Sequence, residues 1–395
     1  MAGSVTEQPF VIAGGGIGGL AAAVALARKG FPVRVLEQSS EFREVGAGIQ
    51  LGPNIFRALD KLGLRNAVLT DAWQPGALEM RDALDGHLVT RMPLNTDVFA
   101  ARFGEPYAVT HCADIHGSIL KAARDSNLIS LETSRRVVDF EEHGGGVGVT
   151  LDDSERVQGR ALLGADGLWS RIRERILGDG APRVSGHIAY RAVLRRADVP
   201  EDLWRPDVML WAGPKTHLVH YPLRRGELFN LVAVFHSDRY EEGWNAEGDI
   251  GELMRCFQGQ RPEVMRLLDK IETWRMWVLC DREPVKTWVR GRVALMGDAA
   301  HPMLQYLAQG AAMAVEDAVR IADEVERRPD DPAAAFAAYQ DARYLRTGRV
   351  QLMARVYGEF YHARGVTAEL RDRMLGARTP EQAYDGMAWL YGEAA

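Results

Sequence analysis

Short apolar runs and helix-forming stretches alternate along the first part of the chain. Phe10–Ala13 is a run of four apolar residues, and Val33–Leu36 is rich in valine, so both are typical of buried strands. Between them, Leu20–Arg28 is rich in alanine and leucine, which favours a helix, and Gly30 is placed to end it. A strand, a helix and a strand in this order predict a βαβ unit with two parallel strands.

Further along, the spacing of apolar positions changes several times. Pro53–Leu62 and Ala113–Ala123 have helical patterns, and short apolar runs separated by turns between Leu128 and Leu163 predict a small antiparallel meander. Alternation of apolar and polar residues from about 180 to 285 predicts an antiparallel sheet, with strands near His187–Val193, Val208–Trp211, His217–Tyr221 and Leu228–Phe235.

The last third of the chain is mainly helical in pattern. Val293–Met296 predicts one more buried strand, and a helix beginning at Gly310 is expected to run through about Val325. Pro332–His362 is helical almost throughout. The whole pattern therefore predicts an α/β protein with an antiparallel-β insertion and a C-terminal helical region.

Composition excludes several classes of protein. The chain has 395 residues, 47% hydrophobic and 26% charged, which is an ordinary globular balance and not that of a disordered chain. The net charge of −6 provides no basic excess for nucleic acid. Pro9–Ala27 is uncharged but interrupted by glycines, so neither a signal peptide nor a membrane span is expected. Three cysteines without metal-ligand spacing predict no metal site and favour a reducing cytoplasm.

The first candidate site is the GGGIGG turn between the two parallel strands. Gly14, Gly16 and Gly19 have the GxGxxG spacing, and Glu37 ends the next strand 18 residues after Gly19. Glycines let a pyrophosphate approach the positive terminus of the helix that follows, and a carboxylate can hold a ribose diol. A second glycine-rich stretch, Gly144–Gly148, lies between two predicted strands and is interpreted as a hairpin turn.

Two further motifs have the same arrangement of a loop that opens a helix. The first, Gly164–Gly167, contains Asp166 and is followed by Ser170. The second, Gly297–His301, contains Asp298, and Gly310 lies 13 residues after Gly297. Either aspartate is also typical of an ordinary helix N-cap. Together, in this order, they favour a nucleotide site in which Asp298 holds a polyol and the Gly310 helix start faces a carbonyl-bearing ring.

These three motifs, written GGGIGG with Glu37, GADGLWSRIR and GDAAHPMLQYLAQG…EDA, resemble the fingerprints of the FAD-dependent aromatic hydroxylases of the p-hydroxybenzoate hydroxylase fold. The resemblance covers nearly the whole chain. It implies a Rossmann-like FAD-binding domain over 1–75, 100–180 and 285–330, an inserted antiparallel-β substrate domain over 76–99 and 181–284, and a helical region over 331–395.

The resemblance also implies which residues hold the cofactor. Non-covalent FAD is expected to lie against the first turn, the second motif and the third motif, with NADH as co-substrate and no second nucleotide domain. The implied FAD-binding residues are Gly14, Gly16, Ile17, Gly18, Gly19, Glu37, Asp166, Gly167, Asp298, Ala308, Gly310 and Ala311. One departure is Cys112, two residues before Asp114, where relatives often have an arginine near the flavin.

Within the family, four stretches resemble the branch that hydroxylates 3-hydroxybenzoate para to its phenol: Glu105–Tyr107, Thr216–Leu223, Asp281–Pro284 and Leu304–Leu307. The resemblance implies that His217 is the base that activates the phenol, with Gln305 beside it. Tyr221 is expected on the same strand face as His217. Tyr107 is expected to contact the carboxylate or hydroxyl of the substrate. His220 is expected on the opposite face, and His301 as an organiser of its loop.

The expected partners are a small aromatic hydroxy acid, NADH and O₂, in a homodimer without nucleic acid. NADH would reduce the flavin, and O₂ would convert it to a C4a-hydroperoxide that hydroxylates the ring to give gentisate. Salicylate 1-hydroxylase, which decarboxylates its substrate, and 6-hydroxynicotinate 3-monooxygenase are the alternatives within the family. A flavoprotein that reduces O₂ without hydroxylating is an alternative of another class, as is a dehydrogenase that binds NAD alone.

Overall fold

The computed structural model describes residues 8–43, 47–237 and 246–392. One layer is a six-stranded sheet in the order β18-β19-β11-β1-β2-β7, called the parallel sheet because every neighbouring pair except β18–β19 runs parallel. Its strands are β1 (Phe10–Ala13), β2 (Val33–Leu36), β7 (Ile129–Glu132), β11 (Ala161–Gly164), β18 (Val289–Arg290) and β19 (Val293–Leu295). The predicted βαβ unit is confirmed, with α1 (Ile17–Arg28) between β1 and β2.

The second layer is an eight-stranded sheet in the order β16-β17-β12-β15-β14-β13-β4-β5. Its strands are β4 (Ala77–Asp82), β5 (Leu88–Pro93), β12 (Arg183–Arg195), β13 (Val208–Gly213), β14 (Thr216–Leu223), β15 (Leu228–His236), β16 (Ala246–Glu247) and β17 (Arg275–Asp281). The predicted antiparallel sheet is confirmed with one difference. β4 pairs with β13 in parallel, because β4 comes from a distant segment that joins the sheet edge independently of the hairpins.

Two smaller sheets complete the strands of the fold. β8 (Val137–His143), β9 (Gly146–Leu151) and β10 (Arg156–Gly159) form the predicted meander. The flanking strands β7 and β11 belong instead to the parallel sheet, where the fully buried β11 is covered on both faces. The turn at Gly144 and Gly145, both with positive φ, joins β8 to β9, so the predicted hairpin is confirmed. β3 (Gly48–Leu51) and β6 (Ala108–His111) form a two-stranded ribbon.

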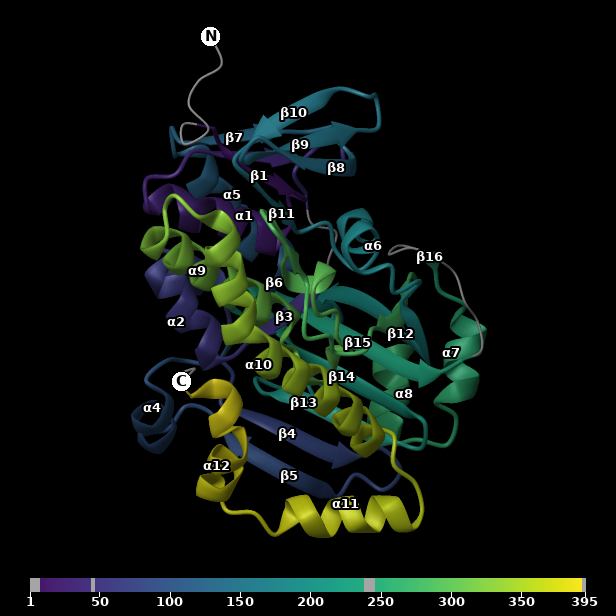
Figure 1. Ribbon diagram of the computed structural model, residues 1–395. Coiled ribbons are helices and arrows are strands. Elements are labelled where there is room, and N and C mark those ends of the chain that lie inside the picture. The colour runs from purple at the N-terminus through teal and green to yellow at the C-terminus, as the bar shows by residue number, and fades with distance from the viewer. Residues whose placement is uncertain (1–7, 44–46, 238–245, 393–395) are drawn as a thin grey trace.

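Helices cover both layers, and Figure 1 shows α10 running from beside α9 across toward the eight-stranded sheet. The remaining helices are α2 (Pro53–Lys61), α3 (Arg65–Asp71), α4 (Asp97–Phe103), α5 (Cys112–Arg124), α6 (Arg171–Leu177), α7 (Ile250–Cys256), α8 (Pro262–Leu268), α9 (Gly310–Arg327), α10 (Pro332–Tyr361), α11 (Val366–Gly376) and α12 (Pro380–Tyr391). Both α11 and α12 lie against β5. Within the described ranges, no helix combines the length and the apolar character needed to cross a membrane.

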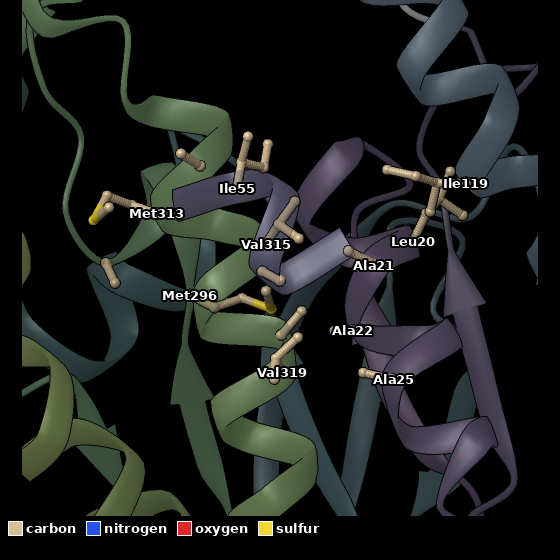
Figure 2. Packing of buried hydrophobic residues seen from close by; sticks show 14 of the residues in the cluster. Leu20, Ala21, Ala22, Ala25, Ile55, Ile119, Met296, Met313, Val315 and Val319 are labelled. Carbon is tan, nitrogen blue, oxygen red and sulfur yellow. The ribbon is translucent and has the colours of Figure 1, made fainter. Parts of the chain in front are cut away.

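The core beside the parallel sheet is built on close contact between α1 and α9. Ala21, Ala22 and Ala25 of α1 face Val315 and Val319 of α9 across a thin interface, as Figure 2 shows. Small side chains allow this approach: a Cβ added to Gly18 would lie 3.1 Å from the Cβ of Ala314. The alanine-rich pattern that predicted a helix therefore also sets how closely α9 can pack, and α9 begins at the third motif.

Candidate active site

The first two motifs meet at the carboxyl end of the parallel sheet. Gly14 has φ +109°, and a Cβ on it would lie 2.3 Å from the carbonyl oxygen of Ala165 in the second motif. A Cβ on Gly19 would lie 2.0 Å from the carbonyl oxygen of Gly14. Side chains at these two positions would push the turn away from its neighbours, so glycine is required at both.

The N-terminus of α1 is open at this turn. Gly16 is the N-cap, and no side chain caps the helix. Among the described residues, the N–H groups of Ile17 and Gly18 have no acceptor, as expected for a helix terminus that binds an anion. Glu37 lies beside the turn at the end of β2, where its carboxylate accepts hydrogen bonds from the backbone N–H of Gly15 at 2.7 Å and of Ser39 at 2.8 Å.

Asp166 has a structural task in addition to its predicted one. Its carboxylate accepts hydrogen bonds from the Ser170 hydroxyl at 2.6 Å and from the Arg171 backbone N–H at 2.9 Å, which stabilises the start of α6. The helix-capping interpretation of this motif therefore describes its local geometry, and its contact with a cofactor stays a prediction. Gly167 has φ +77° with open space where a Cβ would lie, so only its backbone conformation favours glycine.

The third motif is held by a buried ionic cluster. Asp317 accepts hydrogen bonds from the Gly297 backbone N–H at 3.0 Å and from Arg343 Nε at 2.7 Å, and lies 2.6 Å from His301 Nε2. Burial would raise the pKa of Asp317, but His301 and Arg343 outweigh it and lower the pKa to about 2. His301 is thus tied to the loop through its Nε2, which agrees with its expected role as organiser.

The same loop forms one wall of a cavity of about 410 Å³. His301 and Pro302 interrupt the helical pattern, and Ala308 takes a left-handed conformation with φ +51°, so α9 begins at Gly310 without a side-chain cap. Asp298, Ala308, Gly310 and Ala311 all line the cavity. Asp298 is exposed to it, and among the described residues its carboxylate accepts no hydrogen bond.

All four residues predicted to act on the substrate line this cavity: Tyr107, His217, Tyr221 and Gln305. The rest of the wall is mainly aliphatic and aromatic. On β14 the alternation is as predicted, since Val219 and Tyr221 share the cavity face with His217. His220 lies on the other face, where the indole N–H of Trp211 donates to its Nε2 at 3.1 Å.

His217 is buried and neutral at physiological pH. Its Nδ1 lies 2.7 Å from Nε2 of His362, which leaves Nε2 as the ring nitrogen for the cavity. Burial and the nearby His187 lower the pKa of His217 to about 3. The neutral imidazole can therefore accept a proton at Nε2, and it carries no charge before it does so.

The tyrosines in the wall also stay neutral. Burial raises the pKa of the Tyr107 and Tyr221 hydroxyls above their usual range. The Tyr107 hydroxyl donates a hydrogen bond to Gln50 Oε1 at 2.6 Å, so toward a ligand it would act as an acceptor. Its predicted contact with the substrate stays a prediction.

Gln305 is oriented by a residue that the sequence patterns did not single out. Arg191 Nη2 donates to Gln305 Oε1 at 2.6 Å, and the guanidinium lies 4.8 Å from the ring centroid of Trp277. In the part of the chain that the structure describes, no carboxylate pairs with Arg191. The cavity therefore has a positive charge in its wall, with the amide nitrogen of Gln305 beside it.

Comparison with known proteins decides the family. A model described as FAD binding domain matches residues 7–327. The chain is 46% identical over 392 residues to 3-hydroxybenzoate 6-hydroxylase from Polaromonas naphthalenivorans, covering 99% of this chain and 98% of that one. It is 44% identical to 3-hydroxybenzoate 6-hydroxylase 1 from Aquipseudomonas alcaligenes, covering 97% of each. The chain belongs to the FAD-dependent aromatic hydroxylases.

A solved structure agrees with this assignment. Klebsiella pneumoniae HpxO, complexed with FAD and uric acid, superposes on the hydroxylase with a TM-score of 0.87 at 28% identity, covering 98% of each chain. The predicted fold, with its FAD-binding layer and helical C-terminal region, is confirmed. FAD as cofactor and the enzymatic class are likewise confirmed.

The residues of the hydroxylase fit the cofactor. Two uncapped helix N-termini, α1 and α9, provide free N–H groups for a pyrophosphate and for a ring carbonyl. Gly14 and Gly19 leave room for close approach, and the unpaired carboxylate of Asp298 suits a chain of hydroxyl groups.

Sequence patterns missed Arg191 and His362. Arg191 is a charged residue within the apolar alternation of β12, which is a weak signal, and His362 ends a long helix that gave no reason to connect it with β14. Cys112, the departure from the family pattern expected above, begins α5 and lines the cavity.

Proposed function

We propose that this hydroxylase adds a hydroxyl group to 3-hydroxybenzoate para to its phenol and forms gentisate, with NADH as reductant and O₂ as the oxygen source. One observation carries the proposal: a neutral imidazole and an amide oriented by Arg191 both line a mainly apolar cavity beside the predicted flavin site. Relatives 46% and 44% identical over nearly the whole chain are named for this reaction, which supports it.

Bound FAD supplies the electron transfer from the nicotinamide and the activation of O₂. The task of the protein is to make the ring electron-rich and to keep water away. A phenol has a pKa near 10, so at pH 7 it releases electrons weakly into its ring. His217 Nε2 takes the phenol proton, a contribution that typically accelerates such steps by ~10²–10⁴.

Gln305 and Arg191 stabilise the anion that results. With its carbonyl oxygen held by Arg191, Gln305 offers its Nε2–H₂ group to the phenolate oxygen. The charge of Arg191, which no described carboxylate pairs, favours an anionic substrate in a cavity that is mainly apolar. Tyr221, neutral and on the same face as His217, is placed to donate to a substrate oxygen.

The alternatives within the family differ in product. A salicylate 1-hydroxylase would release catechol and CO₂ from salicylate, and a 6-hydroxynicotinate 3-monooxygenase would act on the pyridine acid. The test is NADH oxidation by the FAD-loaded enzyme with 3-hydroxybenzoate, salicylate and 6-hydroxynicotinate, followed by product chromatography. Gentisate from 3-hydroxybenzoate is expected. Catechol from salicylate with 3-hydroxybenzoate inert would contradict the proposal, and hydrogen peroxide without any hydroxylated product would favour an oxidase.

The same proposal includes the finer features of cofactor use. FAD is bound without a covalent link, so acid precipitation releases yellow flavin into the supernatant. NADH is preferred to NADPH, which a comparison of initial rates at matched concentrations tests. The enzyme works in the cytoplasm.

The proposal also includes a homodimer. α10 and α11 expose apolar side chains at helical spacing, at Leu345, Leu352, Val356, Val366, Leu370 and Met374. Two such stripes on neighbouring helices are typical of a surface that a second copy covers.

A further inference from the structure

We propose that the phenol proton taken up by His217 leaves the cavity through His362 and His236. The inference rests on the proposed function, since it concerns the proton that this function removes. Two hydrogen bonds connect the three rings: His217 Nδ1 lies 2.7 Å from His362 Nε2, and His362 Nδ1 lies 3.0 Å from His236 Nε2. Both distances are in the normal range for a hydrogen bond between ring nitrogens.

The three rings lead from the cavity to the surface. His217 is 2% exposed and lines the cavity, His362 is 6% exposed, and His236 is exposed at the end of β15. They come from three elements, since His217 lies on β14 and His362 ends α10. The long helix of the C-terminal region therefore closes a path that the two neighbouring strands leave incomplete.

The nitrogens match a chain of neutral imidazoles. When His217 Nδ1–H donates to His362 Nε2, His362 Nδ1–H donates to His236 Nε2, and His217 Nε2 remains an acceptor for the phenol. The opposite arrangement has every ring in its other tautomer, with Nε2–H of His217 toward the cavity. Passage of one proton along the chain converts the first arrangement into the second.

Each transfer breaks one bond to hydrogen and forms one. The phenol O–H proton moves to His217 Nε2, the Nδ1 proton of His217 moves to His362 Nε2, and the Nδ1 proton of His362 moves to His236 Nε2. The proton on Nδ1 of His236 then passes to water. Return of a proton along the same path to the product oxygen resets all three rings.

The environment explains why the proton has to move on. Burial, together with the neighbouring imidazoles, lowers the pKa of His362, and the pKa of His217 is lowered to about 3. A proton held on either ring is therefore strongly disfavoured near neutral pH. The groups that face these rings include His187, whose ring lies 4.2 Å from that of His236, and Tyr306, whose hydroxyl lies 2.5 Å from His187 Nδ1. Tyr361 packs against His217 with its ring centroid 5.5 Å away. Lys215, Glu359 and Arg364 surround the outer end at His236.

The test measures proton release when 3-hydroxybenzoate is mixed with the oxidised, FAD-loaded enzyme at pH 8. Stopped-flow absorbance of phenol red in weak buffer follows the released proton, and ultraviolet absorbance of the bound phenolate follows ionisation. His362→Gln keeps a side chain that can hydrogen-bond at both ends but cannot relay a proton. It is expected to slow both signals more than 10-fold. His220→Gln is the matched control, a buried histidine on the other face of β14, and is expected to keep the wild-type rate.

A second variant distinguishes loss of the relay from a folding defect in His362→Gln. His236→Ala lies at the surface, and added imidazole is expected to restore its proton release at least severalfold, which a purely structural defect would not allow. Proton release at the wild-type rate in both His362→Gln and His236→Ala would overturn the relay, as would absence of release in the wild-type enzyme. Binding itself is followed by the flavin spectrum: if 3-hydroxybenzoate leaves that spectrum unchanged, the proposed function fails, and the relay with it.

Discussion

Arg191 and Gln305 form one unit in the wall of the active-site cavity. The guanidinium Nη2 donates to the amide Oε1 at 2.6 Å, so the amide nitrogen is the end of Gln305 that remains for a substrate oxygen. Arg191 thereby acts through Gln305 as well as through its own charge. An amide side chain can both donate and accept hydrogen bonds, but because Arg191 occupies its oxygen, Gln305 can only donate to a substrate.

Arg191 and Gln305 should therefore show coupled effects. Gln305→Ala is expected to lower hydroxylation severalfold, and Arg191→Ala by more, because it removes both the charge and the orientation. The double variant should lose less than the product of the two single losses, since residues in contact are not additive. The measurement is gentisate formed per NADH consumed in the wild-type enzyme, the two single variants and the double variant, which together form a double-mutant cycle. Strictly multiplicative losses would show that the two residues act independently.

Replacement of the base should separate hydroxylation from flavin reduction. His217→Ala is expected to retain FAD, because β14 lies outside the three nucleotide motifs, and to lower the hydroxylation rate more than ~10-fold, or ~1.4 kcal/mol. Hydrogen peroxide released per NADH should rise. His220→Ala, on the other face of the same strand, is the control and should change coupling little. Wild-type hydroxylation and coupling in His217→Ala would mean that His217 is structural.

The first glycine turn should tolerate no side chain. Gly14→Ala places a Cβ 2.3 Å from the Ala165 carbonyl oxygen, and the backbone must shift to relieve the contact. Loss of bound FAD and a lower melting temperature are expected. Gly30→Ala is a matched control, because Gly30 also has a positive φ, +86°, but an added Cβ meets nothing within 4 Å. It should cost only ~1–2 kcal/mol of backbone strain. Equal FAD retention in the two variants would contradict the close-approach argument.

Acid should unfold the enzyme partly through Asp317. Its pKa in the folded protein is about 2, below the ordinary value near 3.9, so ionised Asp317 stabilises the fold at pH values above about 4. This stabilisation, on the order of 2 kcal/mol, is lost as the pH falls from about 4 toward 2. Denaturant unfolding at several pH values should show a smaller loss over this window in Asp317→Asn. That variant should also be less stable at pH 7, because Arg343 loses one of its two buried carboxylate partners, Asp317, and keeps only Glu316.

The exposed stripe on α11 should matter for assembly. Leu370 is 54% exposed and lies one turn from Val366. Leu370→Glu is expected to convert a dimer to a monomer in light scattering after size exclusion. Leu84→Glu, at a similarly exposed residue (51%) between β4 and β5, should leave the dimer intact. A monomeric wild-type enzyme would refute the homodimer outright.

Much of the FAD-binding layer was predictable because its signals are local. A turn that needs positive φ at Gly14, a helix of small residues and a valine-rich strand each depend on neighbours in sequence. The same holds for the alternation on β14, which placed His217 and Tyr221 together and His220 apart. The division into domains and the cofactor contacts of individual residues stay predictions.

Sequence by itself determined the nucleotide-binding βαβ unit and the face of β14 that lines the cavity, because spacing along the chain carries that information, and its resemblance to the hydroxylases implied FAD. Tertiary structure decided what meets that face. Arg191 reaches Gln305 from 114 residues away, and His362 reaches His217 from 145 residues away. Such contacts depend on how sheets and helices pack against one another. The residues next to Arg191 or His362 in the sequence do not reveal that packing. The orientation of the amide and the path for the proton therefore became visible only once α10 and β12 were in place.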